Sequence, residues 1–128
     1  MLKNKLKKNK LTIGSWIMMS DSTSVEVMAL AGFDWLAIDI EHTSINLDKL
    51  NVLIQIIQAK KIKALVRVSK NEEVIIKKVL DMGADGIIVP MINSKDDAIK
   101  AINYAKYPPI GMRGVGLTRA SQYGEKFE

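Results

Sequence analysis

Two acids and the only histidine of the chain, Asp39, Glu41 and His42, stand within four positions. They directly follow the apolar run 35–38, whose length and residue types are typical of a buried strand. An imidazole titrates near neutral pH and adjacent carboxylates can orient it, so this spacing suits proton transfer. A structural histidine fits the same spacing. A metal site fits it less well, because three ligands so close together on a strand would point in different directions.

Arg67 is the second candidate, because it interrupts the apolar run 64–68 between two valines. Burying a guanidinium is costly unless it is paired, and Asp39 or Glu41 on the neighbouring expected strand is the obvious partner. A guanidinium can also hold a carboxylate or stabilise a developing enolate oxygen. A structural ion pair and a substrate clamp are therefore both open for Arg67.

The elements that must position these residues recur along the chain. Each apolar strand is followed by a helical pattern, and the step from strand to strand is roughly 23 to 28 residues, the length of a βα unit in a parallel sheet. The expected strands are 11–16, 34–40, 64–68 and 86–90. Helix starts are expected at Thr23 with Glu26, at Asn71, and at Ser94 with Asp97, and helix ends at Gly32 and Gly83.

The helical patterns also predict which side chains face inward. The expected inward-facing residues are Val25, Met28, Ala29, Leu47, Leu50, Ile54, Ile57, Ile75, Val79, Leu80, Ala98, Ala101, Ile102 and Ala105. From residue 107 the prolines and glycines cannot continue a helix, so 107–128 is expected to be an ordered, glycine-rich loop. Its backbone amides could approach an anion, and a plain long connection fits equally well.

Four βα units with strands buried on both faces favour a doubly wound sheet or a (β/α)8 barrel. A barrel takes about 250 residues, so this chain would be half of one. In both architectures the ligand sits at the carboxyl ends of the strands. The residues expected there are Trp16, Asp39, Glu41, His42, Arg67, Pro90 and Met91.

Composition excludes several classes of protein. The chain has 128 residues, 48% of them hydrophobic, which is enough for the core of one globular domain. The first ten residues hold five lysines and no acid, which accounts for the net charge of +5. They are expected to form a leading helix, 1–10. No aromatic residue or arginine accompanies its lysines, so solvated lysines are favoured over a nucleic-acid or lipid arm.

The chain contains no cysteine, so no disulfide framework or zinc-thiolate site is expected. No apolar run approaches the roughly 20 residues that cross a bilayer, and the segment 11–19 lacks a cleavage pattern. The expectation is a soluble, cytoplasmic protein with no nucleic-acid and no membrane partner.

Several motifs together resemble the HpcH/HpaI aldolase family, the metal-dependent class II pyruvate aldolases. The resemblance runs from about Gly14 to the end of the chain, in the family's order. The motifs are Gly32-Phe33-Asp34-Trp35, Asp39-Ile40-Glu41-His42, Val66-Arg67-Val68, Val79-Leu80-Asp81-Met82-Gly83-Ala84, Ile88-Val89-Pro90-Met91, Tyr107-Pro108-Pro109 and Arg113-Gly114-Val115-Gly116.

The resemblance implies a (β/α)8 barrel that assembles as a homo-oligomer. Its reaction would be reversible cleavage of a 4-hydroxy-2-oxo acid to pyruvate and an aldehyde, with magnesium, manganese or cobalt as a Lewis acid. By motif match His42 is the acid–base residue, Arg67 stabilises the pyruvate enolate, and Asp81 raises the basicity of the histidine. Trp16 and Asp39 match further pocket residues.

Two features depart from what the resemblance implies. Spacing places Asp81 in the last turn of a helix, away from the expected site, and a shifted helix end or a neighbouring chain would reconcile the two. The family's metal ligands follow its fifth and sixth strands, so none is expected within this chain. The expectation is therefore the first half of an aldolase barrel, with a non-catalytic association or binding module as the alternative.

Overall fold

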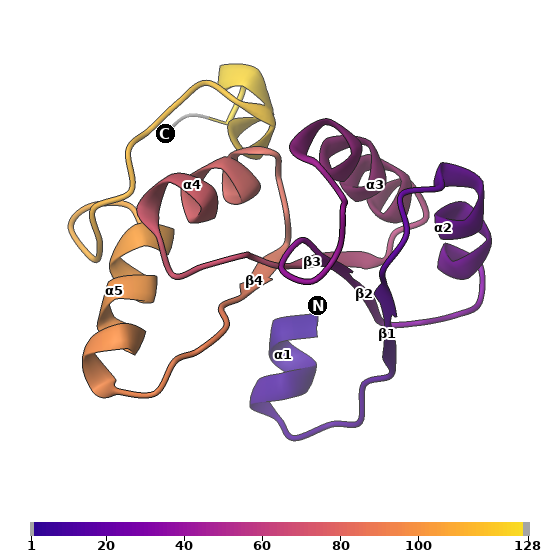
Figure 1. Cartoon of the computed structure of the whole chain (residues 1–128), viewed down its shortest axis with the longest axis horizontal. Helices are drawn as coiled ribbons and strands as arrows, with labels where there is room; N and C mark the ends of the chain where they lie inside the picture. The colour runs from indigo at the N-terminus through magenta and orange to yellow at the C-terminus, as the bar shows by residue number, and fades with distance from the viewer. Residues whose placement is uncertain (1, 127–128) are drawn as a thin grey trace. The chain divides into compact units, whose positions relative to one another are not determined.

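The computed structural model describes residues 2–126, and the chain forms two compact units, Met1–Leu65 and Val66–Glu128. The first unit contains α1 (Leu2–Lys7), β1 (Gly14–Ile17), α2 (Ser22–Ala29), β2 (Trp35–Asp39) and α3 (Leu47–Ala59) (Figure 1). The boundary falls inside β3 (Lys63–Arg67). The second unit contains α4 (Glu73–Asp81), β4 (Gly86–Ile88), α5 (Lys95–Ala105) and the 3-10 helix η1 (Arg119–Gly124). Four βα units are thus present, as the sequence predicts.

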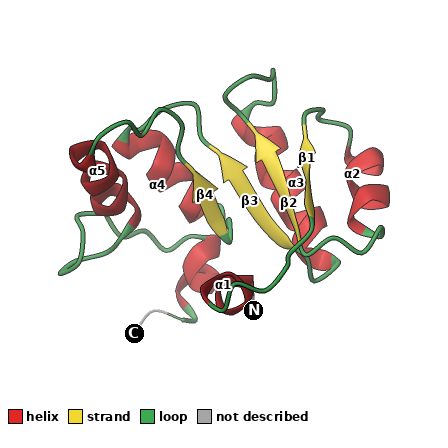
Figure 2. Ribbon diagram, turned by 90° about the horizontal axis from the view of Figure 1, so that it is seen from below, coloured by secondary structure: helices red, strands yellow, loops and turns green. Residues whose placement is uncertain are grey.

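The strands of the first unit are parallel neighbours. β1 pairs with β2 in a register that places Gly14 opposite Trp35 and Ile17 opposite Ile38 (Figure 2). A Cβ atom at Gly14 would lie only 2.1 Å from Cδ2 of Trp35, so a glycine is needed where the indole approaches β1. On the other side of β2, the Lys63 amide at the start of β3 donates to the carbonyl of Asp34 over 3.4 Å. β2 is therefore the inner strand of this unit, and its last four residues are buried.

The helices of the first unit bury the faces that their periodicity predicts. α2 packs against α3. The buried residues of the two helices are Val25, Ala29, Leu50, Leu53, Ile54 and Ile57. Met28 and Leu47, also expected to face inward, are only partly buried. The predicted core of this unit is therefore confirmed, apart from these two partly buried residues.

The N-cap of α2 lies two residues before the predicted one. Asp21, not Thr23, is the N-cap: its Oδ1 accepts from the amide of Ser24 over 3.2 Å. A carboxylate satisfies a free amide at a helix start at least as well as a hydroxyl does. α2 ends before Gly32, whose φ of +84° is the left-handed conformation expected after a helix.

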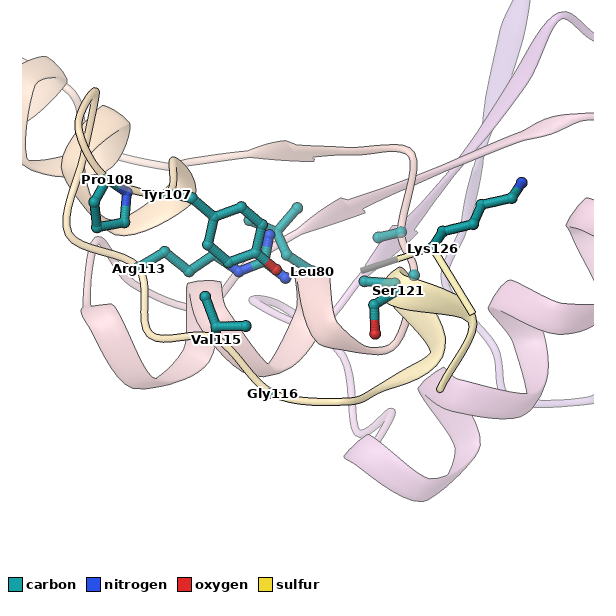
Figure 3. A pocket seen from close by; sticks show the side chains of 11 residues that line it. Leu80, Tyr107, Pro108, Arg113, Val115, Gly116, Ser121 and Lys126 are labelled. Carbon is teal, nitrogen blue, oxygen red and sulfur yellow. The ribbon is translucent and has the colours of Figure 1, made fainter. Parts of the chain in front are cut away.

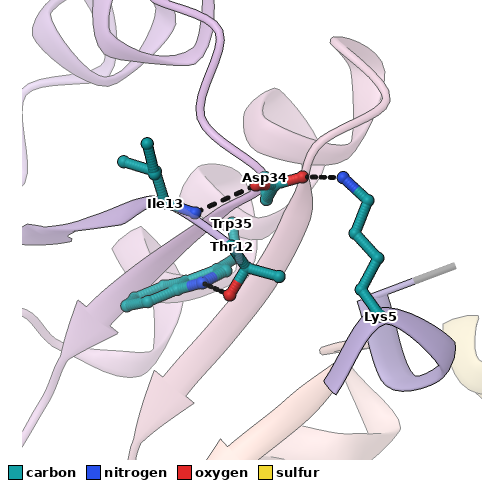
Figure 4. Close-up of polar contacts among 5 residues, drawn as sticks. All are labelled: Lys5, Thr12, Ile13, Asp34 and Trp35. Carbon is teal, nitrogen blue, oxygen red and sulfur yellow. Dashed lines mark hydrogen bonds and ion pairs between the residues drawn. The ribbon is translucent and has the colours of Figure 1, made fainter. Parts of the chain in front are cut away.

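The leading helix is shorter than predicted, and α1 covers Leu2–Lys7 rather than 1–10. Residue 1 lies outside the described residues. Lys5 of α1 lies 2.5 Å from Oδ1 of Asp34, while Oδ2 of Asp34 accepts from the amide of Ile13 over 2.9 Å (Figure 4). Both contacts favour the charged carboxylate and hold the pKa of Asp34 below its ordinary value; the Lys5 hydrogen bond is the larger cause.

In the second unit α4 packs against α5, β4 and η1. Asn71 was predicted to cap α4, and that prediction is wrong. Glu72 is the N-cap residue and makes no capping hydrogen bond with its side chain, whereas Nδ2 of Asn71 donates to the carbonyl of Asp97 over 2.9 Å. The side chain that local spacing assigned to the cap of α4 therefore makes a hydrogen bond to a residue distant in sequence instead.

The start of α5 is as predicted, but its inward face is not. The Ser94 Oγ accepts from the amide of Asp97 over 3.1 Å, and the hydroxyl of Ser94 also lowers the pKa of the Asp97 carboxyl. No residue of α5 is buried, and Ile102 is 52% exposed. β4 is likewise only partly buried and ends at Ile88 rather than Pro90. Periodicity identifies an apolar face but not how much of it the described chain covers.

The glycine-rich segment after α5 is an ordered loop, as predicted. The amides of Met112 and Arg113 donate to the carbonyls of Asn103 and Lys106 over 2.8 and 2.9 Å. The short helix η1 was not predicted. No helix among residues 2–126 is long and apolar enough to cross a membrane.

Candidate active site

The turn that carries His42 is built by Asp39. The Asp39 side chain is fully buried at the end of β2. Its Oδ1 accepts from the amides of Glu41, over 2.9 Å, and of His42, over 3.3 Å. The Thr43 hydroxyl donates to the Asp39 carbonyl and accepts from the amide of Ile45 over 3.2 Å. An aspartate that bonds the backbone two residues ahead forms a turn by itself, so the chain reverses here for a local reason.

The His42 ring projects from this turn into solvent. Its side chain is 66% exposed, and Nε2 lies 3.5 Å from Oε2 of the partly buried Glu41. The backbone of His42 is held by Asp39 while its ring remains accessible to a ligand. An accessible imidazole beside a carboxylate can take or give a proton. The acid–base role of His42 stays a prediction.

Trp16 belongs to the same edge of the first unit. It lies on β1 opposite Ala37, one position before the pair Ile17 and Ile38. The carboxyl ends of β1 and β2 therefore bring Trp16 to the edge at which the Asp39 turn begins. The structure thus gathers four of the predicted site residues in one unit: Trp16, Asp39, Glu41 and His42.

Arg67 is the last residue of β3, partly buried between the fully buried Val66 and Val68. Its predicted pairing with Asp39 or Glu41 stays a prediction. Pro90 and Met91 follow β4 in the same unit, and Met91 is exposed with a φ of +55°.

Asp81, the last residue of α4, has a partner that the sequence did not indicate. Its Oδ1 lies 2.5 Å from Nη2 of Arg113, whose side chain is only 7% exposed. The Arg113 guanidinium also lies 4.5 Å from the centre of the Tyr107 ring (Figure 3). The pair ties the loop after α5 to the end of α4. An acid at a helix C-terminus interacts unfavourably with the helix dipole. This position was the one local sign that the Asp81 carboxylate is paired with a cation elsewhere, but it did not identify that cation.

The second unit also contains a cavity of about 630 Å³. Leu80, Tyr107, Arg113, Val115 and Lys126 contribute to its wall (Figure 3). None of the predicted site residues lines it. The cavity is therefore distinct from the candidate site that the strand ends predict.

Within residues 2–126 no group of three or more His, Cys, Asp or Glu side chains could hold a metal ion. Asp39, Glu41 and His42 are close in sequence, but the Asp39 carboxylate is engaged by the backbone of the turn. The described residues therefore do not fit the divalent ion that the resemblance implies.

The sequence profile of the HpcH/HpaI aldolase/citrate lyase family matches residues 12–124. This chain belongs to that family. Two relatives are similar over nearly the whole chain. The 4-hydroxy-2-oxovalerate aldolase of Rhodococcus jostii is 42% identical over 95% of this chain and 48% of the relative. The 4-hydroxy-2-oxo-heptane-1,7-dioate aldolase of Shigella sonnei is 43% identical over 92% of this chain and 46% of the relative.

Solved structures of the HpcH/HpaI family have the same fold. The crystal structure of a family protein from Burkholderia cenocepacia has a TM-score of 0.91 and 31% identity, over 98% of this chain and 52% of that one. The chain thus spans about half the length of the relatives it matches. Its fold class, four parallel βα units of the TIM-barrel type, is confirmed, whereas the roles of individual residues stay predictions.

Proposed function

We propose that this chain contributes the acid–base part of a class II pyruvate aldolase, which cleaves a 4-hydroxy-2-oxo acid reversibly to pyruvate and an aldehyde. The observation that carries the proposal is the His42 turn. A buried carboxylate fixes the backbone of the only histidine, and its ring is exposed beside Glu41. The family and its aldolase relatives support the reaction class.

In the proposed cleavage His42, acting through a water, removes the proton of the 4-hydroxyl group. The C3–C4 bond breaks as the C4 carbonyl forms, the aldehyde leaves, and the electron pair remains on C3 as the pyruvate enolate. A proton then returns to C3 and gives pyruvate. Arg67 is assigned to the enolate oxygen, because a guanidinium stabilises developing negative charge.

The remaining assignments rest on the motif match. Asp39 holds the His42 turn, Trp16 lines the substrate pocket, and Asp81 raises the basicity of the histidine. Within the first unit, Glu41 is the carboxylate described beside the ring. The proposal includes a divalent ion that would polarise the 2-oxo group when bound. No step is assigned to it, because the described residues offer it no set of ligands.

The test is pyruvate release from 4-hydroxy-2-oxopentanoate with added Mn²⁺, followed through a coupled dehydrogenase. The His42→Ala variant is expected to be about 10²- to 10⁴-fold slower, the usual contribution of a general acid–base group. Ser44→Ala, an exposed change two residues away, is the matched control and should keep the unmodified rate. Equal rates for His42→Ala and the unmodified chain would rule out the acid–base role.

A second function, association without catalysis, is favoured by the exposed face of α5, where Ile99 and Ile102 are open to solvent. Exposed apolar faces of this kind mark interaction sites. This reading predicts no pyruvate release above background, together with oligomers in light scattering. A monodisperse 14.2 kDa species would contradict the association.

Family membership leaves the aldehyde open. The substrates in the names of the two relatives differ in length and charge, since the heptane-1,7-dioate is two carbons longer than the valerate and carries a second carboxylate. Their identities to this chain are nearly equal, so the choice must come from the residues around the site.

A further inference from the structure

The cavity of the second unit, about 630 Å³ in volume, has the size of a small-molecule site. Figure 3 shows Tyr107 and Arg113 on one side of it and Ser121 and Lys126 on the other. Much of the remaining wall is apolar, with side chains from the end of α4, the loop after α5 and η1. These apolar side chains include Leu80, Ala84, Val115 and Ala120. A ligand with an apolar body therefore fits the cavity.

The wall of this cavity is held in place by contacts within the second unit. The Arg113 guanidinium is paired with Asp81, and the Arg113 amide donates to the carbonyl of Lys106 over 2.9 Å. The first residue of η1, Arg119, donates from Nη1 to the carbonyl of Met82 over 3.2 Å. A wall that is fixed by such contacts needs little ordering when a ligand binds, which favours binding.

Arg113 also brings an unsatisfied donor to this wall. Its side chain is 7% exposed, and its buried Nε has no hydrogen-bond partner among residues 2–126. Thr118 lies along the chain between the lining residues Gly116 and Ser121, and its buried hydroxyl likewise has no partner among those residues. Buried polar groups are nearly always hydrogen-bonded. Two unsatisfied groups in the segment that forms the wall therefore indicate a ligand with hydrogen-bond acceptors.

The charge of the wall indicates which acceptor. Among residues 2–126 no acidic side chain lines the cavity, whereas Arg113 and Lys126 are cationic. Asp81, which does not line the cavity, compensates Arg113. Lys126 forms no ion pair within the described part of the chain, so it can balance one negative charge on a ligand. A guanidinium carries several N–H donors, so Arg113 can bind a second carboxylate beside that of Asp81.

We propose that this cavity binds an organic monocarboxylate with a flat, apolar body. A carboxylate oxygen accepts from Nε of Arg113, the exposed Lys126 balances the charge, and the ring system lies among the apolar side chains. Nε is covered in the structure, so binding displaces the Tyr107 ring, which is 39% exposed and packs on the guanidinium. An aromatic ligand replaces that contact, because aromatic rings pack well against guanidinium groups and against tyrosine. The inference does not depend on the proposed aldolase reaction.

The test is the binding of 2-naphthoate to the full chain, measured by isothermal titration calorimetry and located by ¹H–¹⁵N NMR. Two further probes each remove one property of the ligand, since 2-naphthamide lacks the charge and pyruvate lacks the apolar body. We expect 2-naphthoate to bind at least about tenfold more tightly than either. The amide signals of Gly116 and Ser121 should shift, whereas that of Gly14 in the first unit should not.

Three variants test the assigned residues. Ala120→Phe fills the cavity from an exposed position and should abolish binding, whereas Ala31→Phe, at an exposed alanine of the first unit, should not affect it. Arg113→Lys keeps a cation beside Asp81 but removes Nε, and should weaken the binding of 2-naphthoate at least about tenfold. Lys126→Gln should weaken it only about threefold, the size expected of an exposed ion pair.

Several outcomes would overturn the inference. Equal affinities for 2-naphthoate and 2-naphthamide would show that no carboxylate is recognised, and equal affinities for 2-naphthoate and pyruvate would show that the apolar wall is not used. Unchanged binding in Ala120→Phe would place the ligand elsewhere, and this variant decides the matter even if Arg113→Lys fails to fold. His42→Ala should bind 2-naphthoate as the unmodified chain does, so failure of the proposed reaction and failure of this site are distinguishable.

Discussion

The two units of the chain are stabilised by different means. Of the buried hydrophobic residues, all but four (Val66, Val68, Ile76 and Val79) belong to the first unit. The second unit has polar anchors instead. Arg113 is buried against Asp81 and Tyr107, and Nη1 of Arg119 donates to the carbonyl of Met82 over 3.2 Å.

This difference indicates where each unit is vulnerable. Apolar packing is spread over many side chains, so each substitution removes one share of it. A buried ion pair concentrates its contribution in two side chains, and losing one leaves the other as an uncompensated charge. Substitutions in both units therefore test whether the contrast is real.

The largest effect is expected from Asp81→Ala in the second unit. It leaves the Arg113 guanidinium buried without its carboxylate, which costs about 3 to 5 kcal/mol. Urea denaturation measures the free energy of unfolding, and Asp96→Ala, which removes an exposed acid of α5, is the control. The double variant Asp81→Leu, Arg113→Met should recover much of the loss. If Asp81→Ala lowered the free energy of unfolding no more than Asp96→Ala does, the buried ion pair would not be the anchor that distinguishes the second unit from the first.

A substitution that creates a cavity in the first unit should lower the free energy of unfolding somewhat less than Asp81→Ala does. Leu53 is fully buried on α3 and its neighbour Val52 is 44% exposed. Leu53→Ala is expected to destabilise the chain by about 3 kcal/mol, because it removes apolar contacts and leaves a void. Val52→Ala should change the free energy of unfolding by less than about 1 kcal/mol. Similar losses for both variants would mean that the α3 core is not packed as described.

Removal of the side-chain cap of α5 should have a smaller effect on stability. Ser94→Ala removes the acceptor for the amide of Asp97, at a typical cost of about 1 kcal/mol. Ser44→Ala is the control, because Ser44 is an exposed serine outside a cap. Thermal unfolding followed by circular dichroism compares the two variants. Equal melting temperatures for Ser94→Ala and the unmodified chain would contradict the capping role.

The smallest effect concerns pH. The pKa of Asp34 is lowered in the folded chain, chiefly by its hydrogen bond with Lys5. The stability it contributes is therefore complete above the unfolded pKa and is lost as the pH falls through the lower, folded pKa. Lys5→Met should raise the pKa of Asp34 in an NMR titration of its carboxyl carbon, whereas Lys3→Met should leave it unchanged. An unaltered titration in Lys5→Met would show that the ion pair does not form in solution.

The parts of the fold that follow from local pattern were predictable. Leu50, Ile54 and Ile57 recur at helical spacing and are buried as that spacing predicts. The contacts that join distant segments were not predictable. Arg113 reaches Asp81 across 32 positions, and Asn71 turns to Asp97 instead of capping α4. No local period encodes such contacts, because each depends on how the loop after α5 and the helices pack.

The same distinction between local and long-range features applies to the candidate site. Asp39, Glu41 and His42 stand within four positions, and their turn is held by nearby side chains, those of Asp39 and Thr43. The exposure of Met18 and Met19 was not anticipated, because an apolar pair after a strand is usually part of a core. The roles of Arg67 and Asp81 depend on residues far apart in the chain, so local spacing does not define them and they stay predictions.

The turn at Asp39 also makes His42 a double reporter. Its amide is held by a buried carboxylate, while its ring is open to solvent. Hydrogen exchange at the amide should therefore follow the integrity of the scaffold, and isotope-labelled ring signals should follow the arrival of a ligand. Because the chain contains a single histidine, both signals are assigned without any substitution. One residue can thus separate a ligand that fails to bind from a turn that has come apart.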